Sequence, residues 1–245
     1  MSAARTAATA GRVLTQLRHD GRTVGIMLVV PCLLLGLIAW MFADSPYPVL
    51  DTFGPLLLGI FPAVVMFLIA SVATLRERTS GTLERLMTTP IAKADFLIGY
   101  AVAFAVAAAI QAMVLSGFAI WVCGMNVAGS PWLMMAVAIV DAVLGSTLGL
   151  AASAFARTEF QAVQSMPAFL LPQIAVCGLI MPRDQMPTVL EWLSNVVPFA
   201  YATDAMQAIA AAEPVGNVLA DVGIVVGFIA VSLAAGVATL RRRTG

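Results

Sequence analysis

The stretch FPAVVMFLIASVATL, residues 61–75, is apolar on every face and carries no charge. A membrane-spanning β-strand alternates apolar and polar residues over about ten positions, whereas a membrane-spanning helix is apolar all round. The stretch therefore predicts a transmembrane helix, and other apolar stretches of similar length lie on both sides of it. We expect six spanning helices, at about residues 24–43, 53–75, 96–123, 131–156, 165–182 and 218–240.

The composition places the chain among membrane proteins. Apolar residues make up 61% of its 245 residues, charged residues only 11%, and the mean hydropathy is +0.97. A disordered chain, a coiled coil or a basic nucleic-acid-binding protein could not solvate so much apolar surface. We expect an all-α polytopic protein with a single transmembrane domain over residues 1–245, membrane lipids around it and no nucleic-acid partner.

The basic residues predict the orientation of the six helices. Twelve of the thirteen lie before the first span, between the second and third, between the fourth and fifth, or after the last. Only Arg183 falls in the other set of loops. Because basic residues are retained on the cytoplasmic side, we expect both termini in the cytoplasm. The loops at 44–52, 124–130 and 183–217 then face outward.

The N-terminal segment, residues 1–23, is expected on the cytoplasmic side. Residues 4–20 can form an interfacial amphipathic helix at the membrane surface. Its apolar face holds Ala7, Ala10, Leu14 and Leu17, and arginines lie elsewhere on it. A flexible basic tail is the alternative. A signal peptide fits less well, because the apolar stretch that follows, about 19 residues, is longer than the usual 7 to 15 or so.

Catalytic and metal-binding residue types are scarce. His19 is the single histidine, which argues against a Ser/His/Asp triad or a histidine cluster within one span. Lys93, the single lysine, follows alanine rather than the glycine of a GxxxxGK phosphate-binding loop. Cys32, Cys123 and Cys177 show no metal-ligand spacing. We expect no catalytic site, no metal, no cofactor in this chain and no ATP hydrolysis by the chain itself.

The loop RERTSGTLERLMTTPIAKAD, residues 76–95, is the densest charged segment. Ser80 or Gly81 can cap a short helix, and Glu84 then lies in its first turn, where a carboxylate suits the helix dipole. Pro90 ends such a helix one or two residues earlier. The alternative is an ordinary solvated loop whose charges only fix the topology.

Residues 77–90, ERTSGTLERLMTTP, resemble the segment E-x-x-x-G-T-L-E-x-L-x-x-[ST]-P of the ABC-2 type exporter permeases. Later segments are similar to that family as well: ARTEFQA at 156–162, MPRDQMP at 181–187 and PFAYATDAMQAI at 198–209. The resemblance runs from about residue 76 to 240. It is nearest to the drug and antibiotic exporters of the daunorubicin-exporter type.

The resemblance implies a permease subunit of an ABC exporter in the bacterial cytoplasmic membrane. Two six-helix permeases, identical or paralogous, then meet in the membrane, and two separately encoded ABC ATPase subunits, which bind ATP and Mg, dock beneath them. The charged loop is then a coupling helix seated in a groove of the ATPase. The positions that match the motif are Glu77, Gly81, Thr82, Glu84, Arg85 and Pro90. Aromatic residues, on which sugars stack, make up only 8% of the chain. We therefore expect an amphipathic drug or lipid as substrate rather than a polysaccharide.

The segment between the fifth and sixth spans is too long for a turn and has too many polar residues and prolines for a full span. VLEWLSNVV at 189–197 and FAYATDAMQAIAAA at 199–212 predict two short re-entrant helices that dip into the outer leaflet. We expect Trp192, Phe199 and Tyr201 to anchor them at the interface. In the family such helices cap the substrate path. A folded loop lying on the lipid surface is the alternative.

Asp141 is the one carboxylate well inside a predicted span. Burying it costs free energy unless it finds a partner or water, so it must point into the bundle. Gly145, Gly149 and Ser153 follow at intervals of four, and such a stripe of small residues allows close helix approach. A carboxylate hydrogen-bonded between packed helices and a polar point on the substrate path both fit. Two other polar residues inside spans are candidates for the same roles, as partners of the aspartate or on the path: Gln111 and Gln173.

A secondary transporter or channel without an ATPase is the main alternative to the exporter. Such proteins carry inverted repeats, interrupted helices in matching halves, or several intramembrane charges that couple ions. One intramembrane aspartate gives this alternative little support.

Overall fold

The computed structural model describes residues 3–79 and 93–239. The helices are α1 (Ala3–His19), α2 (Gly21–Met41), α3 (Val49–Thr79), α5 (Lys93–Gly117), α6 (Pro131–Ala152), α7 (Glu159–Val176), α8 (Thr188–Ser194), α9 (Pro198–Ala210) and α10 (Val215–Thr239). A π-helical turn, η1 (Phe118–Val122), extends α5, and a 3-10 turn, η2 (Arg183–Gln185), precedes α8. Within the described residues all regular structure is helical, as the sequence predicts.

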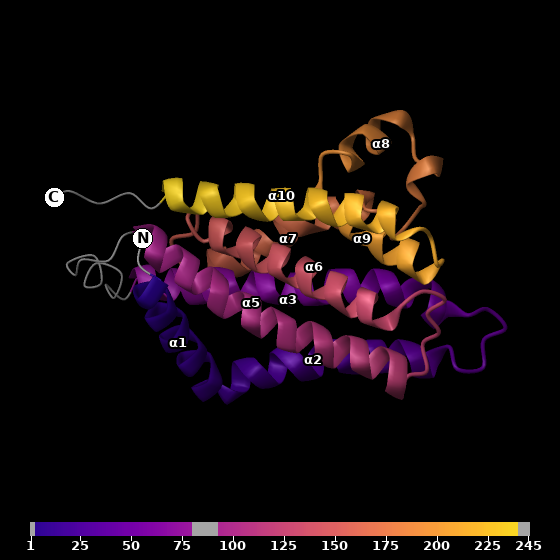
Figure 1. The fold of residues 1–245 in the computed structure, drawn as a ribbon, viewed down its shortest axis with the longest axis horizontal. Coiled ribbons are helices and arrows are strands. Elements are labelled where there is room, and N and C mark those ends of the chain that lie inside the picture. The colour runs from indigo at the N-terminus through magenta and orange to yellow at the C-terminus, as the bar shows by residue number, and fades with distance from the viewer. Residues whose placement is uncertain (1–2, 80–92, 240–245) are drawn as a thin grey trace.

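The long helices lie side by side along one axis (Figure 1). At the centre α3 packs against α6, and α5, α7, α9 and α10 surround this pair. At one end α1 turns away from α2, and at the other end α8 projects from the bundle (Figure 1). The start of α1, the end of α3 and the end of α10 share the first of these ends. Segments far apart in the sequence therefore meet there.

Small residues allow α3 and α6 to approach closely. Gly145 and Gly149 of α6 face the backbone of Ala63 and Phe67 on α3, where a Cβ on either glycine would overlap the facing carbonyl oxygen. No side chain therefore separates the two backbones at these positions. This is the close approach that the spacing of the small residues predicts.

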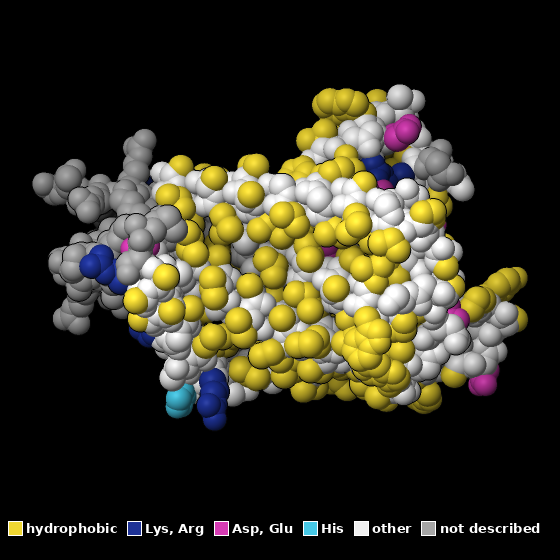
Figure 2. All heavy atoms as spheres, viewed as in Figure 1, with side chains coloured by type: hydrophobic (Ala, Val, Ile, Leu, Met, Phe, Trp, Pro, Cys, Tyr) yellow, Lys and Arg dark blue, Asp and Glu magenta, His cyan; other side chains and the backbone are white. Residues whose placement is uncertain are grey.

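An apolar surface covers the middle of the bundle. Figure 2 shows apolar side chains over α2, α5, α6 and α10, and charged side chains near the two ends of the molecule. Large apolar residues on these helices are exposed, among them Leu33 on α2, Ile110 on α5 and Val231 on α10. Soluble proteins rarely expose a continuous apolar surface of this kind, which suits contact with lipid.

Within the described residues, five helices are long and apolar enough to cross a membrane. They are Gly21–Met41, Val49–Thr79, Asp95–Val122, Pro131–Ala152 and Val215–Ala238. They correspond to five of the six expected spans.

The expected span at 165–182 is placed differently, because α7 begins at Glu159 and ends at Val176. Thr158 caps its start by accepting a hydrogen bond from the backbone N–H of Gln161, and Gly178, at φ +97°, follows its end. These local signals fix the helix ends more strongly than the apolar stretch does. That α7 crosses the membrane stays a prediction.

The N-terminal segment is helical, as α1, and it packs on α5. Ala10 and Val13 are buried in the main apolar cluster together with Phe96 and Leu97. The structure therefore shows a packed helix here rather than a flexible tail. That α1 lies at the membrane surface stays a prediction.

Candidate functional site

The charged end of α3 is the described part of the predicted coupling segment. Glu77, the first residue of the matching motif, lies in its last turn. The other motif positions lie outside the described residues: Gly81, Thr82, Glu84, Arg85 and Pro90.

Three consecutive residues at this end, Arg76, Glu77 and Arg78, contact three different helices. Successive residues on an α-helix point about 100° apart, so three neighbours face three directions. Arg76 reaches the start of α7, Glu77 reaches α1, and Arg78 reaches the end of α6. The end of α3 is thus tied to the ends of three other helices.

Glu77 is held by a polar cluster that α1 and α5 supply. The Nη1 of Arg12 donates to Oε1 of Glu77 at 3.0 Å, and the Nη2 of Arg12 donates to the hydroxyl of Tyr100 at 2.8 Å. Gln16 donates to the same carboxylate oxygen at 3.3 Å. The Glu77 side chain is only 12% exposed and that of Arg12 31%. A partly buried ion pair is screened less by solvent than a surface pair, so this contact fixes α1 on α3.

Sequence reasoning did not identify Arg12, Gln16 and Tyr100 as partners of this loop. The signal was present on α1, where Arg5, Thr9, Arg12 and Gln16 recur at spacings of four, three and four. That spacing places polar side chains in one stripe of a helix, and Thr9 on it is buried. A polar stripe on a packed helix indicates a polar partner, although it does not say which.

Arg76 and Glu159 form a two-pronged ion pair between α3 and α7. The Nε and Nη2 of Arg76 donate to the two carboxylate oxygens of Glu159 at 2.8 and 3.0 Å. Both side chains are more than half exposed, so the pair contributes at most about 1 kcal/mol. The pair joins the end of α3 to the segment 156–162, which also resembles the family.

Arg78 helps to cap the C-terminal end of α6. Its Nη1 donates to the carbonyl oxygen of Ser153 at 2.8 Å, and Ser153 is the C-terminal cap of α6. A cation at this place compensates the unpaired carbonyl groups and the negative end of the helix dipole.

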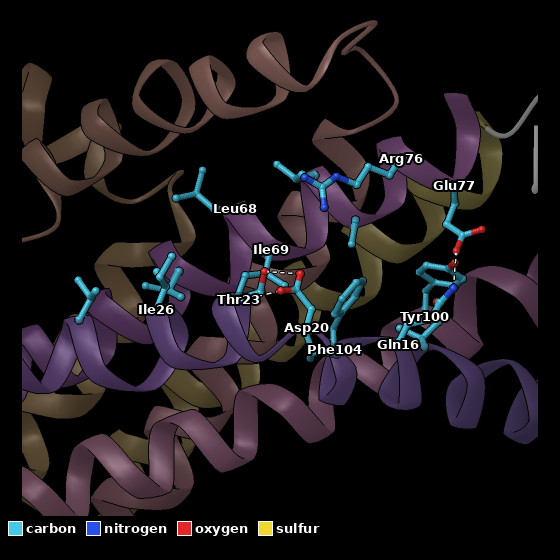
Figure 3. A pocket seen from close by; sticks show the side chains of 16 residues that line it. Gln16, Asp20, Thr23, Ile26, Leu68, Ile69, Arg76, Glu77, Tyr100 and Phe104 are labelled. Carbon is cyan, nitrogen blue, oxygen red and sulfur yellow. Dashed lines mark hydrogen bonds between the residues drawn. The ribbon is translucent and has the colours of Figure 1, made fainter. Parts of the chain in front are cut away.

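A groove of about 710 Å³ lies beside this cluster, between α1, α2, α3 and α5. We refer to it as the α2–α3 groove. Its walls are mostly apolar, with Ile26 and Val30 from α2 and Leu68 from α3. Figure 3 shows Arg76 and Glu77 toward one end of the groove and Ile26 and Leu68 toward the other, with Asp20 and Thr23 between them.

The three polar residues expected inside the bundle are buried. Asp141 is fully buried, and its carboxylate faces Gly59 on α3. Gln111 lies on α5, and Gln173 on α7 donates to the backbone carbonyl of Phe169 at 3.0 Å. Among the described residues the side chains of Asp141 and Gln111 have no hydrogen-bond partner, so the structure does not pair them with each other.

The aromatic residues expected as outer anchors occupy different environments. Trp192 on α8 is 66% exposed, and Tyr201 on α9 donates its hydroxyl to the carbonyl of Asn195 at 2.9 Å. Phe199 is fully buried and packs in the apolar cluster that includes Phe67 and Leu170. It therefore does not anchor at the interface as expected, because α9 turns this side chain inward against α3 and α7.

Arg183 organises the segment between α7 and α10, which the sequence predicts on the outer side. It forms an ion pair with Asp204 on α9, donates to the hydroxyl of Ser194 at 3.0 Å, and lies over the ring of Tyr201 at 5.4 Å. Burial raises the pKa of Asp204, while the nearby Arg183 acts in the opposite direction. The single basic residue on the expected outer side thus holds η2, α8 and α9 together.

Comparison with known proteins shows the family of the chain. The family model of the ABC-2 type transporter matches residues 6–210. The probable multidrug ABC transporter permease YbhR of Escherichia coli K12 is 28% identical over 150 residues, which are 61% of this chain and 41% of that protein. The linearmycin resistance permease protein LnrN of Bacillus subtilis 168 is 27% identical over 180 residues, 73% of this chain and 46% of that protein. Nodulation protein J of Rhizobium leguminosarum bv. viciae is 24% identical over 172 residues, 69% of this chain and 64% of that protein.

The chain thus spans less than half the length of YbhR and LnrN. The family match, in contrast, covers most of this chain, from within α1 through the segment 76–95 to the end of α9. This multi-pass helical chain belongs to the ABC-2 type transporter family and is an ABC-2 permease.

Proposed function

We propose that this chain is the membrane-spanning permease subunit of an ABC exporter. It forms the path for an amphipathic drug or lipid, and the ATP is hydrolysed by a separately encoded ABC ATPase that binds ATP and Mg. Two permeases and two ATPase subunits make up the complex. The permease function of the relatives and the multidrug and resistance descriptions of YbhR and LnrN support this proposal.

The observation that carries the proposal is the three-way junction at the end of α3. The segment 80–92, which contains most of the coupling motif, follows α3 directly. A displacement of that segment by the ATPase acts on α3 at residues 76–78, and these pass it to α7, α1 and α6 through the contacts already described. The close packing of α3 on α6 then carries it into the bundle, because packed backbones move as a unit.

The same proposal includes the topology. The six spans are the five long apolar helices together with α7, whose 18 residues can cross the membrane with the outer helices shielding its end. The termini and the end of α3 face the cytoplasm of a bacterium, and α8 and α9 lie on the outer side as re-entrant helices. The clustering of basic residues supports this orientation.

The test is co-purification of the chain with ABC ATPases of the same organism, those of neighbouring genes first, followed by ATPase and export assays in liposomes. We expect a stable complex whose ATPase activity rises with a subset of amphipathic drugs or lipids. In the control complex, the lysine of the ATPase's phosphate-binding loop is substituted, so that ATP hydrolysis is lost. Export by the two complexes is then compared. Transport that persists with this inactive ATPase, or that follows an ion gradient instead, would establish the secondary transporter and refute the proposal.

A further inference from the structure

The α2–α3 groove has a long apolar wall, and charged side chains of both signs line its other part: Asp20, Arg76 and Glu77. The apolar wall includes Ile26, Val30, Val65 and Leu68. Leu68 is partly exposed although it lies in the middle of α3, so the groove is not closed by the packed core. The volume, about 710 Å³, is in the range of pockets that bind small molecules.

Two carboxylates line the groove, Glu77, which is paired with Arg12, and Asp20. Asp20 is held by Thr23. Its Oδ2 accepts the hydroxyl of Thr23 at 2.7 Å, and its Oδ1 accepts the backbone N–H of Thr23 at 3.1 Å. These hydrogen bonds lower the pKa of Asp20, and Arg76 and Arg22 lower it further. Asp20 is therefore ionised at neutral pH and fixed in position as the N-cap of α2.

The positive charge comes from Arg76. Its ion pair with Glu159 uses one N–H of Nε and one of Nη2, while a guanidinium has five N–H donors in a planar fork. Further donors thus remain for a second oxyanion. Guanidinium groups bind phosphate well because several of their N–H groups reach neighbouring oxygens at once.

We propose that the α2–α3 groove binds one zwitterionic phospholipid, with its phosphate at Arg76, its ammonium group at Asp20 and an acyl chain along Ile26, Val30, Val65 and Leu68. This inference depends only on the chain lying in a membrane and not on export.

The charges favour a zwitterionic lipid over other amphiphiles. An anionic lipid satisfies Arg76 but brings its charge beside Asp20 and Glu77, which both line the groove. A cationic amphiphile satisfies Asp20 but meets Arg76, whose field reaches Asp20. Only a headgroup with both charges complements both residues. Phosphatidylethanolamine has this headgroup.

The test uses the full-length purified chain in mild detergent, titrated with dioleoylphosphatidylethanolamine and followed by native mass spectrometry. We expect one tightly bound lipid per chain. Dioleoylphosphatidylglycerol, dioleoylglycerol and dodecyltrimethylammonium should each bind about tenfold more weakly, the loss of one charge-assisted contact. Equal or tighter binding of any of the three would overturn the proposal. So would the absence of a one-to-one lipid complex, which is also the result expected if a second copy of the chain covers the groove.

Variants with matched controls test whether the lipid binds in the groove. Asp20→Asn removes the charge and keeps a good N-cap, so it should weaken lipid binding about tenfold while α2 stays intact. Arg76→Gln should do the same, whereas Glu159→Gln breaks the same ion pair without changing the groove and should leave binding unchanged. Leu68→Trp fills the groove and should abolish binding, whereas Val231→Trp, on the exposed face of α10, should not. Equal effects within either of these control pairs would show that the lipid binds elsewhere.

Discussion

Arg12 on α1 and Glu77 on α3 are 65 residues apart in the sequence and form an ion pair at 3.0 Å in the structure. The pair joins the N-terminal helix to the first residue of the coupling motif. It ties α1 to the end of α3, so we expect a displacement of that end to act on α1.

The first prediction concerns this ion pair. Glu77→Gln should lower the unfolding free energy of the chain by about 1 to 3 kcal/mol, because Arg12 and Gln16 lose a partly buried charged acceptor. A double-mutant cycle with Arg12→Gln, read by thermal unfolding, should show a coupling energy of about 1 kcal/mol. Arg18→Gln, on the exposed side of α1, is the control and should change little. Additive effects of the two substitutions would contradict the pairing.

The second prediction concerns Glu84 in the coupling segment. Reversing its charge with Glu84→Lys should weaken co-purification of the ATPase and abolish export, because an interface contact becomes repulsive, at a cost of a few kcal/mol. Membrane insertion should stay normal, since the neighbouring arginines still fix the orientation. Glu213→Lys makes the same reversal at an exposed position before α10 and should leave both properties unchanged. Wild-type export by the Glu84 variant would remove Glu84 from the coupling contact.

The third prediction concerns Asp141. Its carboxylate is fully buried and has no hydrogen-bond partner among the described residues. An unpaired carboxyl group costs more free energy to bury than a neutral amide of the same size. Asp141→Asn should therefore leave transport intact and raise the unfolding free energy by about 1 to 3 kcal/mol. Asp141→Leu should destabilise the chain, because the larger side chain meets Gly59 on α3. Loss of transport in the Asn variant at undiminished thermal stability would place Asp141 on the substrate path instead.

The fourth prediction concerns the contact between α3 and α6. Gly145→Ala should cost about 3 kcal/mol or prevent folding, because the new Cβ overlaps the carbonyl oxygen of Ala63. Gly223→Ala, in α10, meets nothing within 4 Å and should stabilise the chain by about 0.5 to 1 kcal/mol through helix propensity. Thermal unfolding of the two purified variants gives the comparison. Equal stability of the two would show that α3 and α6 are farther apart than described.

The fifth prediction concerns orientation. Single cysteines in place of Ser45 or Val127, on a cysteine-free background, should react with a membrane-impermeant thiol reagent added to intact cells. A cysteine in place of Ser80 should react only after lysis, because it follows the end of α3 on the proposed cytoplasmic side. The reverse pattern would invert the topology and remove the coupling role of the segment.

The sequence by itself determined the all-α class, the positions of five long apolar helices, the family and the segment that matches the family motif, whose coupling role stays a prediction. These properties depend on local composition: a helix apolar on every face needs about 20 apolar residues wherever it lies. That Gly145 and Gly149 lie at a close helix contact also follows from spacing within one helix, although only the structure shows that they face α3.

The tertiary structure decided which residues meet. Phe199 reads as an interfacial aromatic, but the turn before α9 directs it into the core, and α7 starts at Glu159 because a capping threonine outweighs the apolar stretch. Four residues come to the end of α3 only because the packing brings α1, the start of α5, the end of α6 and the start of α7 to the same level of the bundle: Arg12, Tyr100, Ser153 and Glu159. Periodicity fixes the face of a residue on its own helix. The neighbour of that face is set by how the helices cross, which depends on packing along their whole length.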